Sequence, residues 1–556
     1  MSDIKRSLDH VPQIAIEAHH GDLKTYIELT IQEQDHYGLI DEEFANYIME
    51  QFVSKANGIF LPVVLQLNSL LRKRTRGDME DAIGSISDDL AVVFEEAVAR
   101  TDLLQGDYRL LAKRILAWLT HSKCSLTAKE MGDAICAAEA FKRGKTKWTT
   151  RYRPVPEMVI DCCQGLVVME PVTGRLEFTH FTIQEHLDLH SERLFPRAKQ
   201  DFSKTCIKYL MYDDFESGPC DDDEDLIPRV NRRPFLAYAA QFCGKHAADT
   251  DDVPDVMVIM TQFLERTSST AAAWQVALHV GGYNRLYYTP GECLSVTPLH
   301  VVSQFGLGEA LKPLLKTNHL NEINVRTKIV GSTPVMFAAS EADPDTVHTL
   351  LQAGADPFIR NLYGNALHCA CEAGLSDNIR VLIRFGMCPD GVDAPGSLPP
   401  ILRTLDKDRE GALQTLIVMA DGTTDSGPHQ KQDWDVHLVH EFVLRAVERG
   451  AYKILRWVLE NEHVFDRITR LSRSIRPADM FASHRFCENA SLLEPPTLHL
   501  AITLRDIELV RLLVAWGADP HATNDEGVTA AALALVSGIG AITEALGLRS
   551  SNLPVR

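Results

Sequence analysis

Apolar residues recur at helical spacing along the N-terminal part of the chain. Leu23, Ile27 and Ile31 lie close to 3.6 residues apart, and the same spacing returns at Phe44 and Ile48. No strand-like alternation of apolar and polar positions interrupts this pattern before about residue 100. The pattern predicts that residues 1–100 form partly buried helices.

Three helices followed by a β-hairpin are predicted between residues 101 and 200. Thr127 precedes a helical apolar pattern and is a suitable N-cap, while Gly174 supplies a turn between two short apolar runs. The predicted elements are helices at 108–119, 128–138 and 156–164 and strands around 166–169 and 176–179. This order describes a winged helix.

Residues 201–290 combine an acidic run with an apolar segment. The run Asp221–Asp225 is typical of a solvated loop. The segment that begins at Pro234 and Phe235 is rich in alanine and apolar residues. We therefore predict a helical connector with an acidic loop.

The C-terminal half contains an internal repeat of about 33 residues. One copy opens at Thr333 and closes at Gly354, and another opens at Pro496 and closes at Gly517. The opening residue and the glycine are 21 residues apart in both copies (354 − 333 and 517 − 496). The openings at 297, 333, 365, 496 and 529 give steps of 36, 32 and 33 residues (333 − 297, 365 − 333 and 529 − 496). Two degenerate units are predicted between them, at 401–422 and 441–459.

Each copy has the features of a helix pair. Thr297 and Thr333 can each cap a helix N-terminus, Pro298 and Pro334 stand where a missing N–H costs nothing, and a glycine ends the second helix. The Thr-Pro-Leu-His opening resembles that of ankyrin repeats, which stack because no unit buries its apolar face alone. The positions that carry this resemblance are Thr297, Pro298, Leu299, His300, Thr333, Pro334, Asn365, Leu367, His368, Leu498 and His499. We predict an ankyrin solenoid over residues 291–556.

The resemblance implies that protein partners bind at the first helix of each unit and at the finger turns, which are the turns that connect one unit to the next. The candidate binding residues are Phe358, Arg360, Asn361, Tyr363, His521, Asn524 and Asp525. For any single one of them, a plain solvated turn residue is the favoured alternative. Phe358 and Tyr363 are the better anchors, because aromatic side chains bury a large area at a low cost in entropy.

The N-terminal half resembles another family. The order His20-Gly21-Asp22 and later Asn57-Gly58-Ile59-Phe60 resembles the end of a NACHT-type nucleotide-binding module of the STAND class of signalling NTPases. The segment through His180–Leu187 resembles the winged-helix domain, of the type catalogued in a GPI inositol deacylase, that follows NACHT modules in fungal-type ankyrin proteins. The resemblance implies a NACHT remnant at 1–100, a winged helix at 101–200, a connector at 201–290 and ankyrin repeats at 291–556. It implies a protein-interaction scaffold or sensor attached to the regulatory part of a STAND-like signalling protein.

Composition narrows the choice of partner and compartment. The formal charge of -20 repels nucleic-acid backbones and anionic membranes in general. The 12 cysteines are scattered without a CxxC pair, so neither a zinc site nor a disulfide framework is indicated. We expect a cytoplasmic protein without a membrane span, and a nuclear location stays open.

Catalytic motifs are not complete. A phosphate-binding loop needs a glycine five positions before Gly144-Lys145-Thr146, where this chain has Glu139. We expect the chain to begin after the catalytic part of a NACHT module, to bind no cofactor or metal and not to be an enzyme. Nucleotide is expected only if an upstream NACHT part exists.

One loop leaves alternatives open. Basic residues between Lys142 and Arg153 are interleaved with Phe141, Trp148 and Tyr152, a combination that suits nucleic acid. The helix after it is acidic and apolar, which favours an intramolecular or protein contact instead. Two other functions stay open: a partner subunit, or a truncated form, of a NACHT NTPase switch, and a winged-helix nucleic-acid binder.

Overall fold

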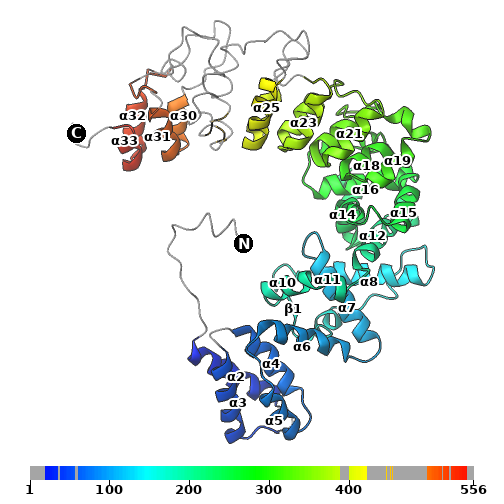
Figure 1. Cartoon of the computed structure of the whole chain (residues 1–556), viewed down its shortest axis with the longest axis vertical. Helices are drawn as coiled ribbons and strands as arrows, with labels where there is room; N and C mark the ends of the chain where they lie inside the picture. The colour runs from blue at the N-terminus through cyan, green and yellow to red at the C-terminus, as the bar shows by residue number, and fades with distance from the viewer. Residues whose placement is uncertain are drawn as a thin grey trace. The chain divides into compact units, whose positions relative to one another are not determined.

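Helices form nearly all of the regular structure. The computed structural model describes residues 19–387 except 36–37 and 57–59, residues 400–422 except 408, positions 446, 451, 454 and 457, and residues 497–547 except 516–517, 522 and 525–526. Within these residues a single two-stranded sheet accompanies the helices, so the predicted mostly α fold class is confirmed. The chain forms two compact units, Met1–Thr250 and Asp251–Arg556, and Figure 1 colours it in chain order.

The first unit is helical apart from one hairpin. Its elements are α2 (His20–Gln34), α3 (Glu42–Lys55), α4 (Phe60–Leu71), α5 (Arg76–Gly84), α6 (Leu90–Asp102), α7 (Asp107–His121), α8 (Ala128–Lys142), α9 (Pro156–Asp161), β1 (Val167–Met169), β2 (Leu176–Phe178), α10 (Phe181–Leu189), α11 (Ser191–Leu194), α12 (Ala198–Tyr209), η1 (Asp213–Phe215), α13 (Asp223–Arg232) and α14 (Leu236–Ala248).

The N-terminal helices bury the periodic apolar positions. Leu23 and Ile27 of α2 pack in one core with Phe44 and Ile48 of α3. Helix α3 begins where the Asp41 side chain accepts the Phe44 N–H at 2.8 Å. The helical spacing in the sequence therefore identifies the buried face, because side chains three and four positions apart lie on one side of a helix.

The predicted order of three helices and a hairpin is present between α7 and β2. Helix α8 begins at Thr127, whose N–H donates to Glu130 Oε2 (2.7 Å) while its hydroxyl accepts the Glu130 N–H (3.2 Å). Strands β1 and β2 are antiparallel, and Val167 pairs with Phe178. Helix α9 ends at Asp161, three residues before the expected position, and the chain then reverses through Gln164–Gly165 with positive φ.

An aromatic cluster forms the core between α7, α12 and α14. The ring of Trp118 stacks on that of Phe202 with centroids 4.0 Å apart, and Phe235, Tyr238 and His246 meet it edge-on. The Tyr238 hydroxyl lies 2.8 Å from His246 Nε2 and accepts the Lys123 N–H at 3.0 Å. Burial lowers the pKa of His246 to about 4, so this ring is neutral at pH 7.

The acidic run is not a loop. Asp222 accepts the Asp225 N–H at 3.0 Å, and residues from Asp223 onward form the first turn of α13. Carboxylates are favourable there, because the unpaired N–H groups and the dipole of a helix N-terminus attract negative charge. The prediction of a solvated loop overlooked that capping role.

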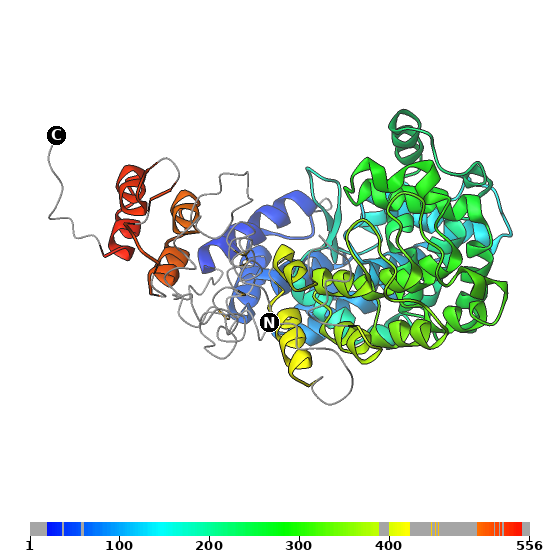
Figure 2. The ribbon, with the colours of Figure 1, turned by 90° about the horizontal axis from the view of Figure 1, so that it is seen from above.

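The second unit contains stacked helix pairs. Its elements are α15 (Pro254–Leu264), α16 (Thr267–Val280), η2 (Arg285–Tyr288), α17 (Pro290–Cys293), α18 (Pro298–Phe305), α19 (Gly308–Leu314), η3 (Asn318–Glu322), α20 (Pro334–Glu341), α21 (Pro344–Gln352), α22 (Ala366–Ala373), α23 (Ser376–Arg384), α24 (Pro400–Arg403), η4 (Thr404–Lys407), α25 (Glu410–Gly422), α30 (Thr497–Thr503), α31 (Ile507–Ala515), α32 (Ala530–Ser537) and α33 (Gly540–Ala545). The first helices α18, α20 and α22 pack against one another in order, and the second helices α21 and α23 do the same. These helices lie in the green to yellow-green part of the ribbon in Figure 1 and Figure 2.

Of the two predicted degenerate units, one lies almost entirely within the described residues and the other lies mostly outside them. The predicted unit at 401–422 consists of α24, η4 and α25. Most of the predicted unit at 441–459 lies outside the described residues. Among the helices that the structure describes, none has both the length and the apolar character needed to cross a membrane.

Candidate partner-binding surface

A histidine links neighbouring repeats at the Thr-Pro-Leu-His position. In α18, His300 Nδ1 accepts the Thr297 N–H at 3.1 Å, and His300 Nε2 lies 3.1 Å from the Ser332 carbonyl of the next unit. His499 Nε2 makes the equivalent contact with the Val528 carbonyl at 2.8 Å. Burial lowers the pKa of His300 to about 4. The neutral ring can therefore accept at one nitrogen and donate at the other, which joins the repeats without a buried charge.

The second copy departs from this arrangement. Thr333 stands at the N-cap position of α20, but its buried hydroxyl has no hydrogen-bond partner within the described residues. The residue at the histidine position is Met336, which is buried and offers no ring nitrogen. The prediction that Thr333 caps its helix is therefore correct in position and wrong in its side-chain hydrogen bond.

The third copy restores the cap with a different residue. The Asn365 side chain accepts the N–H groups of Leu367 (3.1 Å) and His368 (3.3 Å), and His368 Nδ1 accepts the Asn365 N–H at 3.2 Å. Gly364 precedes this cap with φ +137, and a Cβ there would lie 2.4 Å from His368 Cγ. The turn before α22 therefore requires glycine.

The finger between α21 and α22 has a rigid backbone. Asn361 Oδ1 accepts the N–H groups of Tyr363 (2.7 Å) and Gly364 (3.0 Å), and Asp356 Oδ1 accepts the Phe358 N–H at 2.9 Å. The Asn361 Nδ2 atom donates to Ser332 of the preceding finger at 3.0 Å. Asn361, which the sequence suggested as a contact residue, thus shapes the turn.

Further hydrogen bonds join this finger to the one before it. The Leu362 N–H donates to the Val330 carbonyl at 3.1 Å, and Arg326 Nη2 donates to the Arg360 carbonyl at 2.9 Å. Asn324 Oδ1 accepts the Asp356 N–H at 2.8 Å. The side chain of Arg360 is half-buried. Consecutive fingers are therefore one connected structure.

Apolar side chains project from this rigid finger. Phe358 is 48% exposed and Tyr363 is 38% exposed, as expected for binding anchors. Leu362 is 68% exposed, and sequence reasoning missed it. The exposure of Leu362 could have been predicted from the sequence, because an apolar residue at the tip of a polar turn has no core to enter. Val325 and Ile329, each 38% exposed, add apolar surface on the preceding finger.

Tyr363 also has neighbours from two other elements. Its ring lies parallel to that of Tyr287 with centroids 6.3 Å apart, and the two hydroxyl groups are hydrogen-bonded. Arg403 of α24 donates to the Tyr363 carbonyl at 2.8 Å, and its guanidinium lies 5.9 Å from the centre of the ring. Burial raises the pKa of Tyr287, and the bond to Tyr363 raises it further. Tyr363 is therefore held in place before any partner arrives.

The C-terminal finger is built in the same way. Asp519 Oδ1 accepts the His521 N–H at 2.8 Å, and Asn524 Oδ1 accepts the Val528 N–H at 2.9 Å. His521 is exposed, whereas Asn524 is half-buried and shapes the turn as Asn361 does. Asp525 lies outside the described residues.

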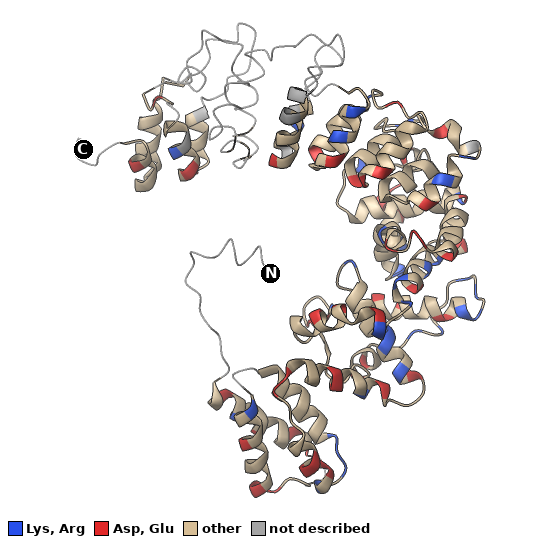
Figure 3. Ribbon diagram, viewed as in Figure 1, with Lys and Arg blue, Asp and Glu red and all other residues tan. Residues whose placement is uncertain are grey.

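The basic and aromatic loop of the first unit packs largely on its own unit. Phe141 stacks on Tyr212 at 5.3 Å, and Trp148 lies beneath the guanidinium of Arg233 at 3.8 Å. Arg153 Nη2 bonds to the buried Asp133 at 2.5 Å. Other basic residues of the loop, Lys145, Lys147 and Arg151, are exposed. Figure 3 colours all Lys and Arg residues of the described chain blue.

Gly144 and Lys145 end a helix. Gly144 has φ +68 and donates to the Phe141 carbonyl at 3.0 Å, and Lys145 donates to the Ala140 carbonyl at 2.9 Å. A phosphate-binding loop instead precedes a helix and presents free N–H groups to the phosphates. Gly144 and Lys145 therefore lie at the C-terminal end of a helix, whereas phosphate binding requires the N-terminal end.

Comparison with known proteins identifies the repeats. A model of three ankyrin repeats matches residues 299–393, and a single ankyrin repeat matches residues 497–525. These matches establish that the chain contains ankyrin repeats, as its spacing predicted, and ankyrin repeats serve in protein–protein interaction. Neither match includes the first unit, whose resemblance to the NACHT and winged-helix families stays a prediction.

Two solved structures are similar over part of the chain. The crystal structure of the human ASB11 ankyrin repeat domain is 18% identical with a TM-score of 0.32, and the match covers 46% of this chain and 100% of that one. The ankyrin repeat domain of Bcl-3, described as a unique member of the IkappaB protein family, is 20% identical with a TM-score of 0.30. That match covers 45% of this chain and 98% of the Bcl-3 chain.

Proposed function

We propose that this chain is a protein-binding adaptor, and not an enzyme, which holds its partner on the ankyrin fingers. The observation that carries the proposal is the apolar finger tip formed by Phe358, Leu362 and Tyr363. The side chains project from a backbone that Asn361 and Gly364 hold in one conformation. Rigid apolar anchors favour binding, because little conformational freedom is lost when the partner docks.

Site-specific photo-crosslinking tests this proposal. A crosslinker placed at position 358 of the full chain should capture a partner, and Leu362→Asp should abolish capture because it places a charge in the apolar contact. Leu103→Asp is the matched control, since Leu103 is 81% exposed and lies in the first unit. Equal capture by the two variants would contradict the proposal.

We further propose that the first unit is the regulatory part of a STAND-like signalling protein. The order of α7, α8, α9, β1 and β2 supports a winged helix, and the helices before α7 suit the end of a NACHT module. In this proposal the repeats sense a partner and the first unit transmits the event to a nucleotide-binding module, in the same chain or in a partner subunit.

This finer proposal predicts that the chain alone binds no nucleotide. The Gly144-Lys145 segment ends α8 and directs its N–H groups to helix carbonyls. Calorimetric titration of the purified chain with ATP or GTP and Mg²⁺ should show no binding heat. Magnesium-dependent binding at micromolar concentration would contradict it.

Nucleic acid is not part of the proposal. Phe141, Trp148 and Arg153 are engaged within the first unit, which leaves few side chains to stack on bases. Fluorescence anisotropy with random duplex DNA should show only weak binding. Tight binding with a log–log salt slope of several units would instead indicate contacts with many phosphates.

A further inference from the structure

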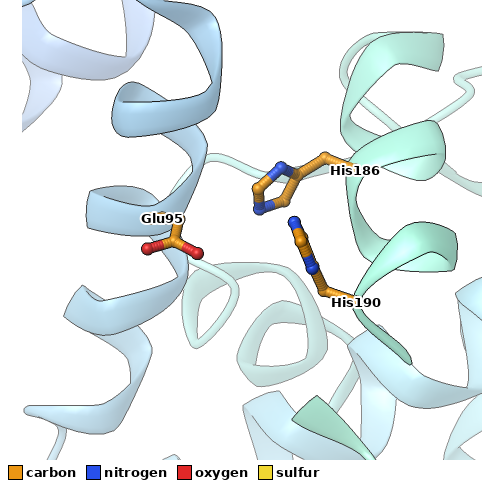
Figure 4. A group of neighbouring side chains, drawn as sticks. All are labelled: Glu95, His186 and His190. Atoms are coloured by element: carbon orange, nitrogen blue, oxygen red, sulfur yellow. The ribbon is translucent and has the colours of Figure 1, made fainter. Parts of the chain in front are cut away.

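Two histidines and a glutamate come together on facing helices of the first unit. His186 lies in α10 and His190 follows it four residues later, while Glu95 lies in α6. One potential ligand atom from each side chain lies within 4.8 Å of the other two. Figure 4 shows both imidazole rings and the carboxylate directed toward the same space. From this geometry we propose a binding site for a divalent transition-metal ion, of the Zn²⁺ class, that joins α6 to α10.

The local structure supports ligation by both histidines. Residues four apart on a helix are neighbours on one face, and the His190 N–H still donates to the His186 carbonyl at 3.2 Å. The two ring centroids are 4.7 Å apart. Ligands of a tetrahedral zinc ion lie about 2.0–2.1 Å from the metal and so about 3.3 Å from each other. The three ligand atoms must therefore move closer together to bind a metal ion. Rotation about side-chain bonds can bring them closer, because Glu95 is exposed and His190 is half-buried.

The surroundings favour a metal that binds nitrogen. Phe94 packs on His186 with ring centroids 5.6 Å apart and covers part of the site. Imidazole suits zinc, nickel and copper, whereas magnesium and calcium prefer oxygen ligands. Three protein ligands leave a fourth position for water or for a side chain of another protein.

Arg193 competes with the metal for Glu95. Its Nη2 atom lies 2.8 Å from Glu95 Oε1, and both side chains are more than half exposed. An exposed pair of this kind contributes little to stability, so a divalent ion can displace it. The guanidinium also adds positive charge beside the site. Removing Arg193 should therefore strengthen metal binding, whereas removing a ligand should weaken it.

Chelator competition with the full chain, purified under reducing conditions, tests the proposal. Zn²⁺ should bind at one equivalent, and Glu95→Gln and His190→Ala should each weaken its binding by at least about tenfold, a loss known even for residues that only support a metal ligand. Arg193→Gln should tighten it. His20→Ala, at an exposed histidine of α2, is the matched control and should leave the affinity unchanged.

Two further measurements separate this site from the cysteines. Bound Co²⁺ should show no thiolate charge-transfer band, and Zn²⁺ but not Mg²⁺ should raise the melting temperature of the wild-type chain more than that of His190→Ala. The proposal is overturned if Zn²⁺ does not bind, if a thiolate band accounts for the bound ion, if Arg193→Gln weakens binding, or if His20→Ala loses as much affinity as His190→Ala.

Discussion

The two units of this protein use buried histidine in different ways. In the second unit, His300 and His499 occupy the same place in two repeats, and each contacts the carbonyl one residue before the next helix cap. In the first unit, His246 belongs to a single cluster around Trp118, where its partner is the Tyr238 hydroxyl. A repeated contact can be recognised from its spacing, whereas a contact made once leaves no period in the sequence.

The difference also concerns the range of each contact along the chain. His300 reaches a carbonyl 32 residues away, about one repeat, and Asn378 reaches the carbonyls that end α20, between 36 and 40 residues away. In contrast, the Tyr209 hydroxyl bonds to Asp133 across 76 residues, and the Tyr238 hydroxyl accepts the Lys123 N–H across 115. We therefore expect damage to the first unit to spread through the unit, and damage to a repeat to spread mainly to its neighbours.

The largest expected effect is in the first unit. Trp118→Ala should destabilise that unit by about 3–5 kcal/mol, because it removes a large side chain that is packed against Phe202 and Phe235. Tyr108→Ala is the control on the same helix, since Tyr108 is 46% exposed. Hydrogen exchange read by segment should show loss of protection from α7 to α14. Loss confined to α7 would contradict a single cooperative core.

A truncation in the repeats should have a similar or smaller effect. Leu513 of α31 is fully buried, and Leu513→Ala should cost about 2–5 kcal/mol through the lost apolar contacts and the cavity. Hydrogen exchange should increase in α30 to α33 while the first unit keeps its protection. Leu504→Ala, at a residue that is 47% exposed, is the control. An unchanged melting curve for Leu513→Ala would mean that the apolar contact between repeats lies elsewhere.

Acid should destabilise both units, through one histidine in each. The pKa values of His246 and His300 are about 4, below the ordinary value of 6.5. Each group therefore adds stability that is fully present above pH 6.5 and is lost as the pH falls through about 4, with a contribution of about 3 kcal/mol. Urea unfolding between pH 7 and pH 4 measures this loss. His246→Asn should reduce the pH dependence of the first unit alone, and an equal change in both units would refute the assignment.

The smallest expected effect is at one polar contact between repeats. Asn378 is buried, and its Nδ2 atom donates to the Ala342 carbonyl at 2.9 Å and to the carbonyls of Ala338 and Ala339 at 3.3 Å. Asn378→Ala should cost about 1–3 kcal/mol, because it leaves buried carbonyls without a donor. Gln352→Ala, at an exposed residue of the neighbouring helix α21, should change stability little. A Tm shift no larger than that of the control would show that water replaces the amide.

The helical class, the repeat period and several helix caps of this protein follow from its residues alone. Periodic apolar residues marked the buried face of α2 and α3, Thr127 marked the start of α8, and the spacing of Thr333 and Gly354 marked one repeat. These are local features, in which the residues that interact lie within a few positions or at a constant interval. The exposure of Phe358 and Tyr363 was predicted for the same reason, since both belong to a recognisable finger turn.

The side chains that meet across different helices and strands are known only from the folded chain. The Asn361 and Asn524 side chains hydrogen-bond within their own turns, and Leu362 projects from the finger. Glu95 meets His186 and His190 across 91 and 95 residues (186 − 95 and 190 − 95). Such contacts depend on how helices pack, and one sequence carries no periodic trace of a pair that occurs once. The segment from α7 to β2 depends on both kinds of information. Its helices and hairpin follow from local signals, whereas the anchoring of Arg153 by the buried Asp133 depends on the folded arrangement of α8 and its loop.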